Sequence, residues 1–164
     1  IENAISESRF VNFKDRIGVT RHNDVADICR HENIHFIKHD MPYRNDMIRI
    51  GVTHIINNSY SDGILFLPAD QPLIKRTSLQ LLCLLFVYHN DKICRLSFNG
   101  NAGSPCIFPS HYFNELLNLP EHNGGGFLIK KYPAQVIAVP AQDKYELYDI
   151  DTPDDIIRLS AISH

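Results

Sequence analysis

The chain has 164 residues, of which 44% are hydrophobic and 21% are charged, and its formal net charge at pH 7 is −3. This length predicts a single domain spanning residues 1–164 with a substantial core, and so small a negative charge excludes a general attraction to nucleic acid or to an anionic membrane. No apolar run reaches the length of a transmembrane helix and no signal peptide is recognisable. Cysteines in apolar surroundings predict a reducing, cytoplasmic location.

Short helices and strands alternate from the N-terminus to residue 56. The predicted elements are a helix at Glu2–Phe10, a buried strand at Asp15–Arg21, a helix at Asp24–His31, a strand at Ile34–Lys38 and a helix at Asp46–Ile56. Strands separated by helices in this way favour parallel pairing.

The next strand, Ile64–Pro68, is apolar without alternation, which is typical of a strand covered on both faces. Pro68 has no backbone donor for a further sheet bond and Pro72 fixes the chain again, so the strand ends abruptly. Asp70 stands between the two prolines. Open α/β sheets bind ligands just beyond the carboxyl ends of their strands, which makes Asp70 a candidate functional residue. A turn or a helix cap is its alternative role.

The remaining elements continue the alternation, so the predicted class is α/β with a mainly parallel sheet. In chain order they are helix Thr77–Tyr88, strand Lys92–Phe98, loop Asn99–Ser104, extended Cys106–Phe108, helices His111–Leu119 and Asn123–Lys131, strands Gln135–Val139 and Glu146–Ile150, and a final helix. Thr152 is predicted to cap that final helix, with Pro153 at its first position.

The cysteines and histidines form no recognisable metal or disulfide pattern. The four cysteines have neither C-x-x-C spacing nor the density of a disulfide-rich domain, and the nine histidines form no H-E-x-x-H or similar set. We therefore expect reduced thiols and no zinc site.

The stretch G-I-L-F-L-P-A-D-Q-P-L at residues 63–73 resembles the metal-site strand of the MobA-like NTP transferases, most closely that of the molybdenum cofactor cytidylyltransferases. Matching motifs follow in the same order: N-G at 99–100, G-S-P-C-I-F-P at 103–109, G-G at 124–125 and D-I-D-T-P-D-D at 149–155. The resemblance implies a Rossmann-like, three-layer α/β/α nucleotidyltransferase fold of the glycosyltransferase-A type, with a mainly parallel mixed sheet.

The resemblance also implies a site that needs Mg²⁺ or Mn²⁺. Asp70 and Asp151 would be its catalytic and metal-binding residues, each following a predicted strand. Asp149 lies two residues before Asp151, on the same side of an extended chain, and is the alternate ligand. Helix capping is the alternative role for Asp154 and Asp155.

Substrate contacts are carried over from the resemblance as well. Those to the nucleotide are Arg49, Gly51, Pro68, Ala69 and Asp70, and those to the acceptor are Asn99, Gly100, Gly103, Pro105 and Gly124. A solvated helix position is the alternative for Arg49, and ordinary turns are the alternative for the glycines and Asn99. Met47 replaces the family's serine, and Glu121-His122 replaces its Gly-Asp.

The implied activity is transfer of CMP from CTP to a molybdopterin-type cofactor with release of pyrophosphate. Two alternatives stay open. The first is a guanylyl or sugar-phosphate nucleotidyltransferase of the same fold. The second is a non-catalytic protein that binds or matures the molybdenum cofactor, with a molybdenum hydroxylase or its maturation proteins as partners.

The family's first strand and Gly-rich loop, L-A-A-G-x-S-x-R-(M/F)-G, have no counterpart in this sequence. The chain is expected to begin after that first βα unit. In the resembled fold the first strand pairs with the neighbours that correspond to Asp15–Arg21 and Ile64–Pro68. Each of these strands is therefore expected to have an unpaired edge, and the chain alone is expected to self-associate and to be inactive.

Overall fold

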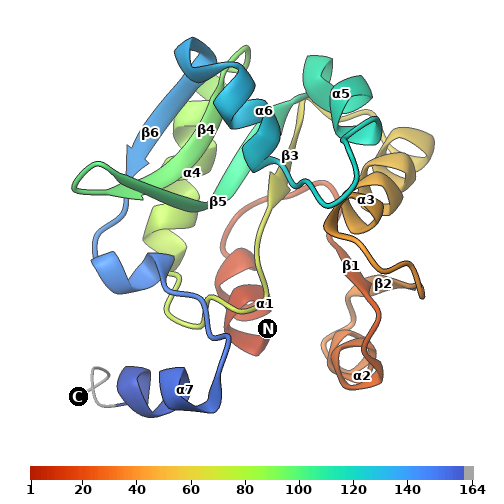
Figure 1. Cartoon of the computed structure of the whole chain (residues 1–164), viewed down its shortest axis with the longest axis vertical. Coiled ribbons are helices and arrows are strands. Elements are labelled where there is room, and N and C mark those ends of the chain that lie inside the picture. The colour runs from red at the N-terminus through yellow and green to blue at the C-terminus, as the bar shows by residue number, and fades with distance from the viewer. Residues whose placement is uncertain (161–164) are drawn as a thin grey trace.

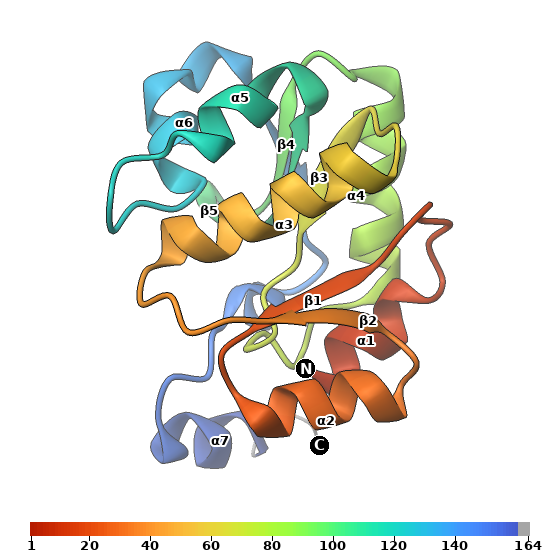
Figure 2. The same ribbon diagram turned by 90° about the vertical axis from the view of Figure 1, so that its right-hand side faces the viewer.

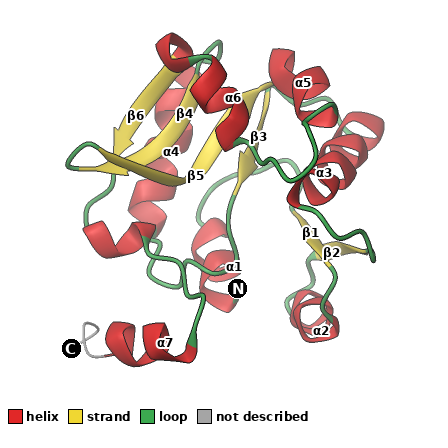
Figure 3. Ribbon diagram, viewed as in Figure 1, coloured by secondary structure: helices red, strands yellow, loops and turns green. Residues whose placement is uncertain are grey.

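In the computed structural model, which describes residues 1–160, helices lie on both faces of a four-stranded sheet (Figures 1 and 3). The strand order is β3 (Gly63–Phe66), β5 (Asn101–Pro109), β4 (Ile93–Phe98) and β6 (Val136–Pro140). β5 runs antiparallel to both of its neighbours, whereas β4 and β6 are parallel. β3, β4 and β6 therefore share one direction, which confirms the predicted α/β class and its mainly parallel mixed sheet.

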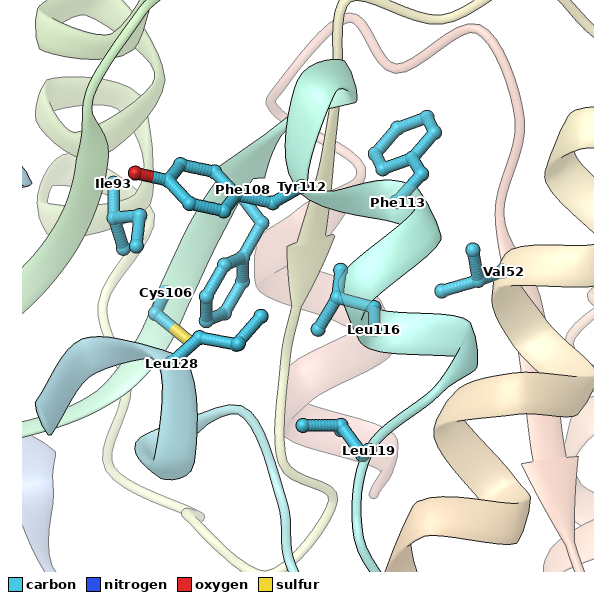
Figure 4. Packing of buried hydrophobic residues seen from close by; sticks show 9 residues of the cluster. All are labelled: Val52, Ile93, Cys106, Phe108, Tyr112, Phe113, Leu116, Leu119 and Leu128. Carbon is cyan, nitrogen blue, oxygen red and sulfur yellow. The ribbon is translucent and has the colours of Figure 1, made fainter. Parts of the chain in front are cut away.

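Alternate residues of the central strands supply the cores on the two faces of this sheet. On one face, α4 (Arg76–Tyr88) packs Leu79, Leu82 and Phe86 against Cys94 and Ile107. The other face is covered by α3 (Arg44–Asn58), α5 (Phe113–Leu117) and α6 (Gly126–Lys131). The cluster on that face is shown in Figure 4 and consists of Val52, Ile93, Cys106, Phe108, Tyr112, Phe113, Leu116, Leu119 and Leu128. The three layers follow directly from this two-sided burial.

A second, two-stranded parallel sheet is formed by β1 (Ile17–Thr20) and β2 (His35–Lys38), which are joined by α2 (Asn23–His31). Figures 1 and 2 show it beneath α3 and beside α1 (Glu2–Ser8), apart from β3. Within residues 1–160 no strand pairing links the two sheets.

The free edges of the two sheets can be assigned from the direction of individual backbone groups. The Thr20 carbonyl accepts a hydrogen bond from His39 N–H on the β2 side, so the backbone groups of Val19 point away from β2. Ser110 N–H donates to the Asp62 carbonyl on the β5 side, so those of Leu65 point away from β5. The predicted unpaired edges of both strands are therefore present.

The predicted loop Asn99–Ser104 is wrong in part, because β4 and β5 form a hairpin whose second strand begins at Asn101. Asn99 and Gly100 make its two-residue turn with φ values of 49° and 82°. Asn-Gly is the pair that adopts this left-handed turn most readily.

The predicted strand Glu146–Ile150 is also wrong, because Lys144–Leu147 forms a 3₁₀ helix instead. Asp143 caps it by accepting a hydrogen bond from Tyr145 N–H. The Glu146 carboxylate is fully buried and accepts from the backbone N–H groups of Gln142 and Asp143. These local bonds satisfy backbone donors that a strand would need to pair elsewhere, which favours the turn.

The remaining predicted elements are present with shifted bounds. Short 3₁₀ turns at Ser110–Tyr112 and Pro133–Gln135 precede α5 and β6. The last helix, α7 (Pro153–Ser160), begins as predicted, and Thr152 donates to the Asp155 carboxylate from its amide and from Oγ1. These bonds, the side-chain bond first, hold the pKa of Asp155 below its usual value. None of the helices between residues 1 and 160 has the length and apolar character that a membrane crossing requires.

Candidate active site

Two aspartates from distant parts of the sequence, Asp70 and Asp149, lie on adjoining segments just beyond the carboxyl end of β3. The Asp70 carbonyl accepts a 2.9 Å hydrogen bond from Ile150 N–H. Gln71 Nε2 donates to Asp149 Oδ1, also at 2.9 Å. These two bonds fasten residues 149–150 alongside residues 70–71, and Asp70 and Asp149 line the same cavity.

The segment that carries Asp149 is also fastened at the start of α4. Glu146 Oε2 accepts a 3.1 Å hydrogen bond from Lys75 N–H, while its other oxygen accepts from the turn at Gln142 and Asp143. A buried carboxylate with three backbone donors is well satisfied. It ties the 3₁₀ helix to the loop that follows Asp70. Residues 146–150 are therefore joined to residues 70–75 at two places, through Glu146 and through residues 149–150.

A cavity of about 860 Å³ opens between β1 and β3, beneath α3 and beside α1. Its volume lies within the range of ligand-binding cavities. Several residues predicted from the sequence line it: Gly51, Pro68, Ala69, Asp70, Gly103, Gly124 and the alternate metal ligand Asp149. The cavity has apolar walls between the two strands, two carboxylates, Asp70 and Asp149, beyond the carboxyl end of β3, and a third, Asp15, before the start of β1.

Other predicted site residues do not line this cavity. Asn99 and Gly100 form the exposed tip of the β4–β5 hairpin, and Pro105 is buried within β5. Arg49 is paired with the buried Asp46 at 2.5 Å. Asp151 is exposed, and its amide donates to Asp155 at the start of α7.

Arg44 and Lys130 are two of the five cations that sequence reasoning missed and that line the same cavity; the others are Lys14, Arg16 and Arg95. Among residues 1–160 neither Arg44 nor Lys130 has a carboxylate partner, whereas Arg49 on the same helix as Arg44 and Lys131 next to Lys130 are both in ion pairs. The side chain of Arg44 lies against Gly124, where a Cβ would come within 2.8 Å of its Cδ. No motif marks either cation, because charge on an exposed helix is ordinary in a sequence.

His122 occupies the rim of the cavity in a left-handed conformation, with φ of 65°. Its amide donates to Oδ1 of the buried Asn45, and its ring contacts Tyr43 edge-on at 4.2 Å between centroids. The loop that replaces the family's Gly-Asp is therefore fixed to the start of α3 and shapes one side of the cavity.

The thiols of the cavity wall are protonated at neutral pH. Burial raises the pKa of Cys106 to about 12 and also raises the pKa of Cys29. A thiolate nucleophile is therefore not available there. Within the described residues there is no group of three or more histidine, cysteine, aspartate or glutamate side chains arranged to hold a metal ion. A cation would need Asp70 and Asp149 together with oxygens from water or substrate.

Comparison with known proteins identifies the family that shares this arrangement. Residues 1–136 match the family described as the MobA-like NTP transferase domain. None of the curated proteins matches the chain.

Solved structures with the same fold are numerous. A nucleotidyl transferase from Methanothermobacter thermautotroptrophicus is 17% identical with a TM-score of 0.78, over 98% of this chain and 78% of that one. A cytidylyltransferase from Leptospira borgpetersenii is 19% identical with a TM-score of 0.72, over 98% and 75% of the two chains. A protein from Mycobacterium tuberculosis in complex with manganese is 20% identical with a TM-score of 0.71, over 96% and 83%. At these identities the likeness establishes the fold.

Proposed function

This chain belongs to the family of MobA-like NTP transferase domains, and on that premise we propose that it is a cytidylyltransferase that transfers CMP from CTP to a molybdopterin-type acceptor and releases pyrophosphate. The observation that carries the proposal is that Asp70 and Asp149, on segments joined by two hydrogen bonds, both line a ligand-sized cavity. The family itself makes the chain a nucleotidyltransferase that uses a nucleoside triphosphate.

The donor set fits Mg²⁺ or Mn²⁺. Magnesium in phosphoryl-transfer sites is usually held by one or two carboxylates, with water and substrate phosphates in its other positions. Asp70 and Asp149 line the cavity and are both exposed, so a carboxylate oxygen of each is accessible for such a role. When bound, the cation would draw negative charge from the triphosphate.

Arg44 and Lys130 supply positive charge on the cavity wall, without carboxylates that would neutralise them. Their place in the proposed reaction is to hold the phosphates of the nucleotide or acceptor. An acceptor phosphate oxygen attacks the α-phosphorus of the nucleotide, and the bond from that phosphorus to the pyrophosphate oxygen breaks. No side chain needs to act as a covalent nucleophile, which agrees with the raised pKa values of the cavity thiols.

Replacing each aspartate by asparagine, which removes the negative charge, tests which carboxylates hold the cation. Asp70→Asn and Asp149→Asn are expected to weaken Mn²⁺ binding, measured by electron paramagnetic resonance. Asp151→Asn serves as the matched control because its side chain does not line the cavity. If only Asp151→Asn weakened Mn²⁺ binding, Asp151 would be the second ligand, as the family motif implies.

The substrate is tested by incubating the protein with molybdopterin, Mg²⁺ and one nucleotide at a time while pyrophosphate release is measured. We expect CTP to be consumed in preference to GTP and ATP. Preference for GTP would indicate a guanylyltransferase, and turnover with a sugar phosphate alone would change the acceptor. Cofactor binding without any pyrophosphate would support the maturation role.

A further inference from the structure

We propose that Gln71 is a positioning residue of this site: it fixes the Asp149 carboxylate beside Asp70 without touching substrate. The inference rests on the proposed function only in treating these two carboxylates as the cation site. It concerns a residue for which neither the family motif nor the sequence pattern gave a role.

Gln71 holds Asp149 from the interior of the protein. Its side chain is 2% exposed and does not line the cavity, whereas Asp149 is exposed and lines it. The 2.9 Å bond from Gln71 Nε2 to Asp149 Oδ1 therefore crosses from the buried layer to the cavity wall. It leaves Oδ2 of Asp149 as the oxygen that is free to face a cation.

The orientation of the Gln71 amide is fixed by this bond. A flipped amide would place its carbonyl oxygen against the carboxylate, and two acceptors would then face each other. In the observed orientation Gln71 Oε1 is buried and has no hydrogen-bond partner among residues 1–160. A buried acceptor without a partner is costly to the folded state.

An unsatisfied buried amide makes Gln71 a poor choice for stability alone. An apolar side chain of similar length, such as methionine, would fill the same space without burying a polar atom that lacks a partner. Gln71 therefore holds Asp149 in place at a cost in the stability of the core. Such conflicts between stability and function are common at active sites.

The test compares Gln71→Met with the unaltered protein and with Gln142→Leu, a change at an exposed glutamine outside the cavity. Mn²⁺ binding is measured by electron paramagnetic resonance without nucleotide, and thermal melting is followed by circular dichroism. We expect Gln71→Met to weaken Mn²⁺ binding about tenfold or more, as losing a partner of a metal ligand usually does. We expect its melting temperature to stay equal or rise, and Gln142→Leu to change neither quantity.

A second variant separates the bond from the shape of the side chain. Asp149→Asn retains an oxygen that can accept from Gln71 but loses the charge, so adding Gln71→Met to it should cost little further affinity. Unchanged Mn²⁺ affinity in Gln71→Met, or a lower melting temperature with intact affinity, would overturn the proposal and make Gln71 a structural residue. Failure of nucleotide turnover with Mn²⁺ binding as expected would instead count against the proposed function alone.

Discussion

Glu146 offers the sharpest link between the fold and the site, because one buried carboxylate holds three backbone donors. Replacing it with alanine leaves the N–H groups of Lys75, Gln142 and Asp143 without that acceptor. A hydrogen bond to a charged group contributes about 1.5–3 kcal/mol, and these three bonds are only partly buried, so the expected loss is about 3 kcal/mol. That is a large share of the roughly 5–15 kcal/mol that stabilises an ordinary domain.

Glu146→Gln is a milder change at the same position. The amide oxygen can keep the two bonds to Gln142 and Asp143, but the NH₂ group then faces Lys75 N–H, donor against donor. We expect a loss of about 1–3 kcal/mol, clearly smaller than for alanine. Mn²⁺ binding should weaken in both variants, because Asp149 lies three residues beyond Glu146 and loses one of its anchors.

The stability changes are measured by urea unfolding followed by far-ultraviolet circular dichroism, since the chain contains no tryptophan. Glu2→Gln is the control, because Glu2 is exposed and its side chain has no hydrogen-bond or ion-pair partner among the described residues. If Glu146→Ala were within about 0.5 kcal/mol of the unaltered protein, as ordinary surface substitutions are, the three hydrogen bonds would not hold this segment and the reasoning would be refuted.

Four further outcomes are expected. Asp70→Ala should abolish the dependence of nucleotide binding on magnesium, and isothermal titration that shows unchanged dependence would contradict this. Gly63→Ala should destabilise the fold by about 1–3 kcal/mol, because its Cβ would lie 2.4 Å from Phe86 Cζ, whereas Gly126→Ala meets nothing within 4 Å and should be neutral in urea unfolding. The hydrogen bond from Lys131, followed by that from Tyr132, holds the pKa of Glu115 below its usual value, so the stabilisation is present above about pH 4.3 and is lost as the pH falls below it. Glu115→Gln should therefore melt earlier than the unaltered protein at pH 7, and the difference should shrink as the pH falls through the lowered pKa of Glu115. The chain should also self-associate in sedimentation experiments through the free edges of β1 and β3, and a monomer at all concentrations would argue against this.

Hydrophobic pattern and turn chemistry were enough to predict most of the fold. The unbroken apolar strand before Pro68 lies at an edge of the sheet, yet helices cover both of its faces. The sequence predicts a loop at Asn99–Ser104, whereas the structure has a hairpin there, and Asn-Gly is itself a signal of a hairpin turn. A local rule was available there and would have been right.

The proposed second carboxylate of the site, Asp149, could not be chosen over Asp151 from the sequence. Asp149 and Asp151 have the same side chain and the same spacing pattern, and what separates them is a hydrogen bond to Gln71, which is 78 positions away along the chain. The strand expected at Glu146–Ile150 failed for a related reason. Its glutamate is buried by contacts with Lys75 at the start of another helix, and no local pattern announces such a contact.

The separation of the two sheets has a consequence for how the protein moves. Within residues 1–160, β1, α2 and β2 share no strand ladder with the four-stranded sheet, and β1 approaches α3 at Gly51, where a Cβ would lie 3.5 Å from Val19 Cγ2. This unit can therefore open while every ladder of the larger sheet stays intact, and its amides should exchange with solvent first. A ligand that spans the cavity would contact both this unit and β3 of the larger sheet. Its binding should therefore slow hydrogen exchange at the amides of the unit.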